Sequence, residues 1–193
     1  MPHDSDSPST PDRVGGLTLF LTGLPGAGKT TLARTLHDCL VARGRIAITV
    51  LDGDEVRRRL SPELGFSRGD RDLHIRRVGF VAREVTRHGG LVICAVVAPH
   101  EDVRREVQRE IEALGAFVLV HVATPLALCE ARDPKGLYAR ARAGRLPSFT
   151  GVSAPYEPPQ APHLTIDTSG ETPDRSAARI LAWLETRRYL STP

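Results

Sequence analysis

The stretch LTLFLTGLPGAGKTT, residues 17–31, decides the fold of this chain of 193 residues. Its first six residues form a short apolar run bounded by glycines, a pattern typical of a buried strand. From Lys29 to about Ala42, apolar residues recur at helical spacing. Between these two segments lies G-x-x-x-x-G-K-[ST], residues 23–30, in the strand–loop–helix context that a phosphate-binding loop requires. The match predicts a nucleotide site rather than a glycine turn without a ligand.

Each part of this loop has a role in holding a triphosphate. Glycines let backbone N–H groups turn toward the phosphates, and the helix N-terminus adds a partial positive charge. Lys29 can bridge the β and γ phosphates, and the Thr30 hydroxyl can ligate Mg²⁺. We therefore predict ATP and Mg²⁺ as cofactors. The predicted nucleotide-binding residues of the loop are Gly23, Gly26, Ala27, Gly28, Lys29, Thr30 and Thr31.

The rest of the chain alternates between strand and helix patterns. Further strands are predicted at residues 46–51, 91–97, 117–122 and 164–167, and helices at 71–88, 102–114 and 173–187, with a short one after Pro125. Such alternation indicates a parallel sheet covered on both faces, because parallel strands need helical crossovers. We predict an α/β fold of the P-loop NTPase type, a three-layer sandwich around a five-stranded parallel sheet with a lid segment.

The chain divides into a tail and one domain. Residues 1–14 are polar and rich in Pro, Ser and Asp, so we expect a disordered N-terminal tail before a single kinase-like domain at 15–190. Between about 133 and 162 the periodicity lapses into Gly, Pro and Arg. A stretch of that length without regular structure inside a compact domain is usually functional, and we predict a lid over an active site.

Composition narrows the class of protein. With 40% hydrophobic and 25% charged residues, the chain is ordinary for one globular domain. No apolar run approaches about 20 residues, and residues 1–13 lack the apolar core of a signal peptide, so we expect a cytoplasmic protein without a membrane partner. The net charge of +3 is mild, and the basic residues are scattered without aromatic interleaving, which argues against nucleic acid as a partner.

Two residue types are informative by their number. The three cysteines are odd in number and lack C-x-x-C spacing, which favours buried thiols over a metal site or a disulfide. Among 26 basic residues only Lys29 and Lys135 are lysines. In a chain that otherwise uses arginine, these two are predicted to do what a guanidinium cannot, such as placing a compact ammonium against a phosphate.

Two carboxylates follow the second predicted strand. Asp52 and Asp54 lie at the carboxyl edge of a parallel sheet, where ligands bind in open α/β folds. One of them can hold a metal-bound water or accept the proton of an attacking hydroxyl. The alternative is an Asx-turn in which the Asp caps the next helix. Because the chain shows neither N-K-x-D nor a switch with a catalytic Gln, a kinase acting on a small molecule fits better than a signalling GTPase.

Several further blocks resemble the adenylylsulfate kinases. Besides the loop, they are LDGD (51–54), LGFS with DR (64–71), IRR (75–77), DPKGLY (133–138), FTG (149–151), APYE (154–157) and DTSG (167–170). The resemblance covers nearly the whole chain after the tail. It implies ATP-dependent phosphorylation of the 3′-hydroxyl of adenosine 5′-phosphosulfate (APS), which gives PAPS in sulfate assimilation.

The resemblance also implies which residues bind the substrate. Phe66 and Phe149 would sandwich the adenine of APS, and Arg57 and Arg71 would grip its phosphosulfate. These residue types suit the task, since an aromatic ring stacks on a base and a guanidinium fork meets two anionic oxygens. Phe149, in a polar segment, is a poorer candidate for core packing than Phe66.

Other roles follow from the same resemblance. Lys135 and Leu137 would touch the substrate from the lid, and Arg132 would lie over the adenine of ATP. Asp54 would be the carboxylate nearest the 3′-hydroxyl and the metal. The predicted catalytic residues are thus Lys29, Asp52 and Asp54, and the predicted metal ligands are Thr30 and Asp54.

Three positions depart from the family pattern. His74 stands where members usually carry an Asn that contacts the substrate, and an imidazole cannot reproduce a two-ended amide. Ala98 replaces a common serine, and Glu101 replaces a common arginine. If Glu101 faces the anionic substrate, it weakens binding. These departures leave two alternatives: a kinase of another nucleotide-like or specialised-metabolite hydroxyl, and a non-catalytic domain that senses APS or PAPS. The resemblance further implies a homodimer and functional coupling to ATP sulfurylase as a separate chain.

Overall fold

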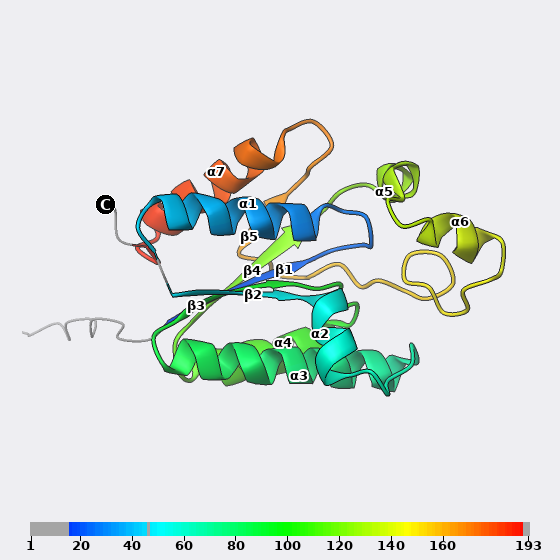
Figure 1. Ribbon diagram of the computed structural model, residues 1–193, viewed down its shortest axis with the longest axis horizontal. Helices are drawn as coiled ribbons and strands as arrows, with labels where there is room; N and C mark the ends of the chain where they lie inside the picture. The colour runs from blue at the N-terminus through cyan, green and yellow to red at the C-terminus, as the bar shows by residue number, and fades with distance from the viewer. Residues whose placement is uncertain (1–15, 46, 191–193) are drawn as a thin grey trace, which may run out of the picture.

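Five parallel strands form the central sheet, in the order β2-β3-β1-β4-β5 (Figure 1). The computed structural model describes residues 16–45 and 47–190. The strands are β1 (Leu17–Thr22), β2 (Ile48–Asp52), β3 (Leu91–Ala95), β4 (Ala116–Val122) and β5 (Leu164–Ile166). Because β1 is central and fully buried, the loop that follows it starts from the most rigid part of the molecule. The predicted fold class is confirmed.

Helices cover both faces of the sheet. On one face, α1 (Lys29–Ala42) packs beside α7 (Pro173–Thr186); on the other lie α3 (Arg68–Arg87) and α4 (Glu101–Glu112) (Figure 1). Each face has its own apolar core, one including Leu36 and Ile180, the other including Val78 and Ile111. Together these cores fix the helices that carry the loops of the site.

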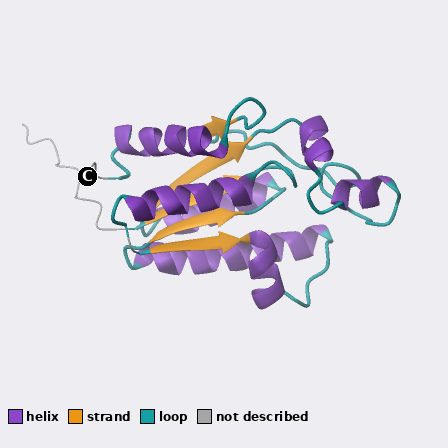
Figure 2. Cartoon of the chain, turned by 45° about the horizontal axis from the view of Figure 1, so that its top comes forward, coloured by secondary structure: helices purple, strands orange, loops and turns teal. Residues whose placement is uncertain are grey.

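Three short helices lie beyond the carboxyl ends of the strands. They are α2 (Gly53–Leu60), α5 (Leu126–Arg132) and α6 (Leu137–Arg142) (Figure 2). Since the strands are parallel, the loops after β1, β2, β3 and β4 all reach this edge. Segments far apart in sequence are thereby brought to one place.

Some predicted boundaries differ from the structure. The second strand was expected from residue 46, which lies outside the described residues, as does the predicted tail at 1–14; the observed β2 begins at Ile48. The expectation that residues 133–162 lack regular structure was wrong at α6. That helix forms because the Asp133 carboxylate accepts hydrogen bonds from the N–H groups of Tyr138 and Ala139, 3.1 and 3.0 Å away. No helix in the described part of the chain is long and apolar enough to cross a bilayer.

Candidate active site

The phosphate-binding loop joins the end of β1 to the start of α1. Gly26 and Gly28 have φ angles of 76° and 96°, in the left-handed region that favours glycine. A Cβ atom at Gly26 would lie 2.9 Å from the carbonyl oxygen of Cys129. The glycines of the motif are therefore required by the backbone, which is what a loop wrapped around a phosphate needs.

Lys29 lies folded inside this loop. Its Nζ donates hydrogen bonds to the carbonyl oxygens of Gly23 and Leu24, at 2.9 and 2.7 Å. The side chain is buried, and burial lowers the pKa of Lys29 from 10.5 to about 8. A buried ammonium whose direct partners are neutral carbonyls is poorly compensated, so an anion in the loop would stabilise it.

Thr30 and Asp52 connect the loop to the end of β2. The Thr30 hydroxyl donates to Asp52 Oδ2 at 2.6 Å, while Asp52 Oδ1 accepts from the backbone N–H groups of Asp54 and Glu55, at 3.0 and 3.3 Å. Burial alone would raise the pKa of Asp52, but these hydrogen bonds outweigh it and lower the pKa. Asp52 thus caps α2, as the alternative interpretation expected, and also orients Thr30; a role toward a metal-bound water or a substrate proton stays a prediction.

Asp54 faces the lid. Its carboxylate forms an ion pair with the Lys135 ammonium, and both side chains are largely exposed, at 70% and 61%. An exposed ion pair contributes little stability, so this contact can be exchanged for a substrate or a metal at low cost. Both lysines of the chain therefore lie at this edge of the sheet, as their rarity suggested.

Two arginines flank an exposed aromatic ring. The guanidinium carbons of Arg57 and Arg71 lie 5.0 and 5.6 Å from the centre of the Phe66 ring, which is 59% exposed. Arg57 donates to the Gly65 carbonyl at 2.9 Å, and Arg71 donates to the Phe66 carbonyl at 2.9 Å. Among the described residues neither guanidinium forms an ion pair with a carboxylate. Two guanidinium groups that form no such ion pair, beside a solvent-facing ring, suit an anionic aromatic ligand.

Phe149 lies in the lid next to this arginine pair. Arg71 donates to the hydroxyl of Thr150 at 2.5 Å and to the Ser148 carbonyl, the neighbours of Phe149 in the sequence. The Phe149 ring packs against the core and edge-on against Tyr138, with ring centres 5.0 Å apart. The expectation that Phe149 packs in the core less than Phe66 was therefore wrong, because Tyr138 provides an aromatic neighbour that local sequence did not reveal.

Arg132 and Leu137 lie on either side of the lid's first turn. Arg132, the last residue of α5, donates to the hydroxyl and the carbonyl of Thr168 at 2.9 and 2.8 Å. Thr168 in turn donates to the Ala27 carbonyl of the loop at 3.2 Å. Arg132 therefore lies next to the phosphate loop. The base of a nucleotide held by the loop would extend away from its phosphates on this side. Leu137 is half-buried at the start of α6.

The three unusual positions have partners within the protein. His74 is 5% exposed, and its Nδ1 lies 3.1 Å from the Ser61 hydroxyl. Glu101 accepts hydrogen bonds from Arg104 and Arg105 at 2.6 and 2.9 Å, so its charge is compensated within the protein. The Ala98 carbonyl accepts from Arg104 at 2.5 Å. Each of the three therefore takes part in a contact within the protein.

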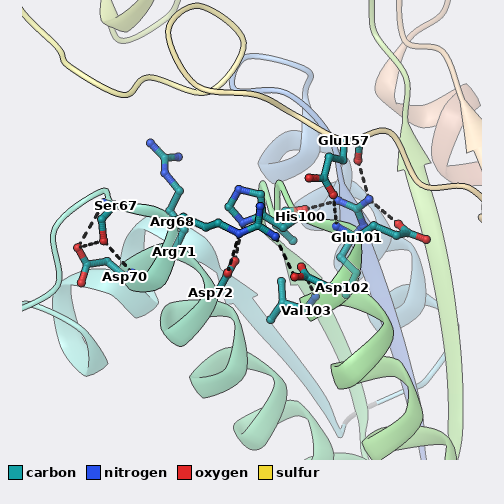
Figure 3. Close-up of polar contacts among 12 residues, drawn as sticks. Ser67, Arg68, Asp70, Arg71, Asp72, His100, Glu101, Asp102, Val103 and Glu157 are labelled. Atoms are coloured by element: carbon teal, nitrogen blue, oxygen red, sulfur yellow. Dashed lines mark hydrogen bonds and ion pairs between the residues drawn. The ribbon is translucent and has the colours of Figure 1, made fainter.

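Several residues to which the sequence assigned no role hold the loop after β3 together with Glu101. Figure 3 shows Glu101 and Glu157 together at the start of α4, where the Glu157 carboxylate accepts from the Glu101 N–H at 2.8 Å. In the same view, Arg68 reaches Asp72, which contacts His100 at 2.5 Å. Arg104 is 1% exposed and donates to the Glu157 carbonyl at 2.6 Å.

A sequence signal existed for one of these residues. Arg104 is three and seven positions before Val107 and Ile111, so it lies on the buried stripe of α4. Tyr138, another residue without a predicted role, donates from its hydroxyl to the Pro25 carbonyl at 2.9 Å and so joins the lid to the loop. No local pattern indicates that contact.

A cavity of about 540 Å³ also lies between the loop and the lid. It is lined by Leu24, Leu126, Pro158 and residues 151–156, and it includes none of the predicted site residues. The candidate site is therefore defined by its charged and aromatic groups rather than by this cavity.

The fold and the site define a P-loop phosphotransferase: a phosphate loop after β1, carboxylates after β2 and a lid over the same edge. The chain belongs to the adenylylsulphate kinase family, whose sequence model matches residues 15–167. The family and the enzyme class expected from the sequence are thereby confirmed.

Known relatives are similar over most of this chain. The adenylyl-sulfate kinase of Rippkaea orientalis is 49% identical over 178 residues, which cover 92% of this chain and 96% of that protein. The structure of the Mycobacterium tuberculosis APS kinase in complex with AMPPNP and APS has a TM-score of 0.82 at 38% identity, covering 89% and 98% of the two chains. The sulfate adenylyltransferase of Aspergillus oryzae is 45% identical over 181 residues; the chain spans only 32% of the length of that relative.

Proposed function

We propose that this chain transfers the γ-phosphoryl group of ATP to the 3′-hydroxyl of APS, giving PAPS and ADP. One observation carries the proposal. The Lys29 loop, Asp54 and the group formed by Arg57, Phe66 and Arg71 lie together at one edge of the sheet. The first part suits a triphosphate, and the second suits an adenine with an acidic tail. Family membership supports APS as the acceptor.

The phosphate side relies on Lys29 and Thr30. With a triphosphate in the loop, Lys29 would exchange the carbonyls of Gly23 and Leu24 for phosphate oxygens and neutralise developing charge. A hydroxyl and one or two carboxylates fit Mg²⁺, which prefers oxygen ligands and few protein groups. Thr30 and Asp54 would hold the ion, and Asp52 would keep the Thr30 hydroxyl in place. Bound Mg²⁺ would withdraw charge from the phosphate oxygens.

The acceptor side relies on Asp54 and the arginine pair. Asp54 would accept the proton of the 3′-hydroxyl, because it projects from α2 toward the lid. Arg57 and Arg71 would bind the phosphosulfate, with Phe66 and Phe149 against the adenine. Lys135 would leave Asp54 and contact the substrate, and Leu137 would close over it. Catalysis would then come from positioning and charge neutralisation.

The two alternative functions lose their motivation. His74 and Glu101 suggested another acceptor, yet both have partners inside the protein. A domain that only senses APS or PAPS would not need Lys29, Thr30 and Asp52 arranged for a γ-phosphate and a metal.

The test is an assay of ADP release with ATP and Mg²⁺. APS is compared with no acceptor and with a panel of adenosine nucleotides and nucleosides, and the product is identified by mass. Lys29→Ala, prepared in parallel, serves as the control for contaminating kinases. We expect ADP release that depends on APS, with PAPS as product. Turnover of another acceptor but not of APS, or binding of PAPS without any turnover, would overturn the proposal in favour of one of the two alternatives.

Partners and location complete the proposal. Functional coupling to ATP sulfurylase is supported by the Aspergillus oryzae sulfate adenylyltransferase, which contains a region similar to this chain. The homodimer implied by the resemblance and the cytoplasmic location stay predictions.

A further inference from the structure

The α2 helix is held weakly by apolar packing. It has eight residues, and Val56 is its one buried residue. A helix of this length is only marginally stable on its own, because the free-energy cost of nucleation exceeds the stabilisation from so few hydrogen bonds. Nevertheless α2 carries Asp54 and Arg57, two residues of the proposed site. Its position must therefore be fixed by contacts at its ends.

The N-terminal end of α2 is fixed by Asp52, which accepts from two of its backbone N–H groups. The C-terminal end is fixed by α3. Arg77 donates to the Leu60 carbonyl at 2.6 Å, and His74 Nδ1 lies 3.1 Å from the hydroxyl of Ser61, the residue after the helix. His74 and Arg77 are three residues apart and so lie on one face of α3. That face brackets the end of α2.

His74 has the properties of a structural linker. Both His74 and Ser61 are buried, at 5% and 0% exposure. Burial, and then the nearby charge of Arg57, lower the pKa of His74 to about 4, so the ring is neutral at physiological pH. A neutral imidazole has one donor and one acceptor nitrogen. One of them, Nδ1, pairs with the Ser61 hydroxyl.

We propose that His74 is a positioning residue: through Ser61 it fixes the C-terminal end of α2 against α3 and so sets the places of Asp54 and Arg57. The effect on catalysis rests on the proposed function, whereas the placement of α2 does not. The residue that departs most from the family pattern thus acts on the site through a helix and not by touching the substrate.

The experiment compares four variants. His74→Leu keeps the bulk of the ring and removes the hydrogen bond to Ser61, Ser61→Ala removes the partner, and the double variant tests whether the two residues act together. His74→Asn is the conservative replacement, since an amide can still bond to Ser61. The matched control is Thr86→Val, which removes another buried hydroxyl pair, Thr18–Thr86 at 2.6 Å, at the opposite end of the sheet.

Two readouts distinguish positioning from general destabilisation. Hydrogen exchange of residues 53–60 should accelerate in His74→Leu and Ser61→Ala but not in Thr86→Val. With APS, kcat/KM should fall about tenfold or more in His74→Leu, since small misplacements of reacting groups are costly. The KM for ATP should change less than about twofold, because Lys29 and Thr30 are carried by the loop and α1 and not by α2. The double variant should resemble His74→Leu, and His74→Asn should recover most of the activity.

The outcomes separate the inference from the function. If His74→Leu loses activity while Ser61→Ala does not, and exchange in α2 is unchanged, His74 contacts the substrate directly and the proposal is wrong. If exchange in α2 is the same in all variants and in the unsubstituted protein, the proposal is also wrong. If the unsubstituted protein does not phosphorylate APS but exchange accelerates as described, the proposed function fails and the positioning role stands.

Discussion

The phosphate loop and the lid meet at the same edge of the sheet but are built differently. In the loop, Lys29 bonds to carbonyls five and six residues away, and the backbone continues directly from a buried strand into a helix with one buried face. The lid is placed by contacts between distant residues, such as Tyr138 with Pro25, Arg71 with Thr150 and Lys135 with Asp54. A local motif therefore specifies the loop, whereas the lid depends on the whole fold.

This difference has a functional meaning. The loop cannot move without disturbing the core, so it forms a rigid binding site for the phosphates. Among the three lid contacts, the Lys135–Asp54 ion pair is largely exposed and can be exchanged for a contact with a ligand, whereas Tyr138 and Thr150 are buried. The lid is accordingly the part expected to open for substrate entry and product release.

The largest effect is expected from the two lysines. Lys29→Ala should reduce kcat by about 1000-fold, because it removes the cation aimed at the transferred phosphate. Lys135→Ala should mainly raise the KM for APS, by about tenfold, since the exposed lid lysine gives binding rather than charge stabilisation in the loop. Steady-state kinetics with each substrate varied measures both. Equal losses of kcat in the two variants would contradict the proposed difference between the phosphate loop and the lid.

Asp54, which touches both regions, should give the next largest effect. Asp54→Asn keeps the shape but removes the base, and we expect kcat to fall about 100-fold or more with little change in ATP binding. Glu55→Gln is the control on the same helix, where Glu55 forms an exposed ion pair with Arg59. Titration calorimetry with ATP separates binding from turnover. A kcat of Asp54→Asn close to that of Glu55→Gln would remove Asp54 from the catalytic role.

The contrast between local and distant contacts also explains what the sequence could predict. The order of strands and helices, the loop and the Asp52–Asp54 pair were all readable, because each depends on a motif or on the period of apolar residues. The Tyr138–Pro25 bond and the Arg104 anchor were not, since they join residues 113 and about 50 positions apart that only the fold brings together. Sequence-based prediction has the same limit at His74. The sequence shows that a histidine replaces the usual asparagine, but it does not reveal Ser61 as the partner of that histidine.

The two phenylalanines test whether an exposed and a packed ring contribute alike. Phe66→Ala and Phe149→Ala should each raise the KM for APS by roughly 5- to 150-fold, the value of a stacking contact of about 1–3 kcal/mol. Only Phe149→Ala should also lower the melting temperature, because its ring packs on Tyr138 and the core. Kinetics and thermal unfolding measure the two effects separately. An unchanged KM in either variant would remove that ring from the adenine site.

ATP binding by the phosphate loop should also depend on pH, in a way that binding by the lid does not. Burial lowers the pKa of Lys29 to about 8, whereas phosphate oxygens favour its charged form. Above that pH, ATP binding must take up a proton, so the Kd for ATP should rise by up to about tenfold per pH unit. Below it Lys29 is already charged and the Kd should be flat. Calorimetry from pH 7 to 9.5 checks this, with Lys29→Arg as the permanently charged control. A flat profile for the unsubstituted protein would contradict the assignment.

The smallest effect is expected from Tyr138→Phe. This variant also gives the sharpest test of how the phosphate loop and the lid are joined. The change removes one hydrogen bond, from the Tyr138 hydroxyl to Pro25, and keeps the ring against Phe149. A net loss of about 1 kcal/mol from the closed lid should raise the KM for APS roughly fivefold and leave the KM for ATP unchanged. Combined with Lys135→Ala, the free-energy changes should add, because the two contacts hold one lid from separate points. A rise confined to the KM for ATP would mean that Tyr138 supports the loop and that the lid closes without it.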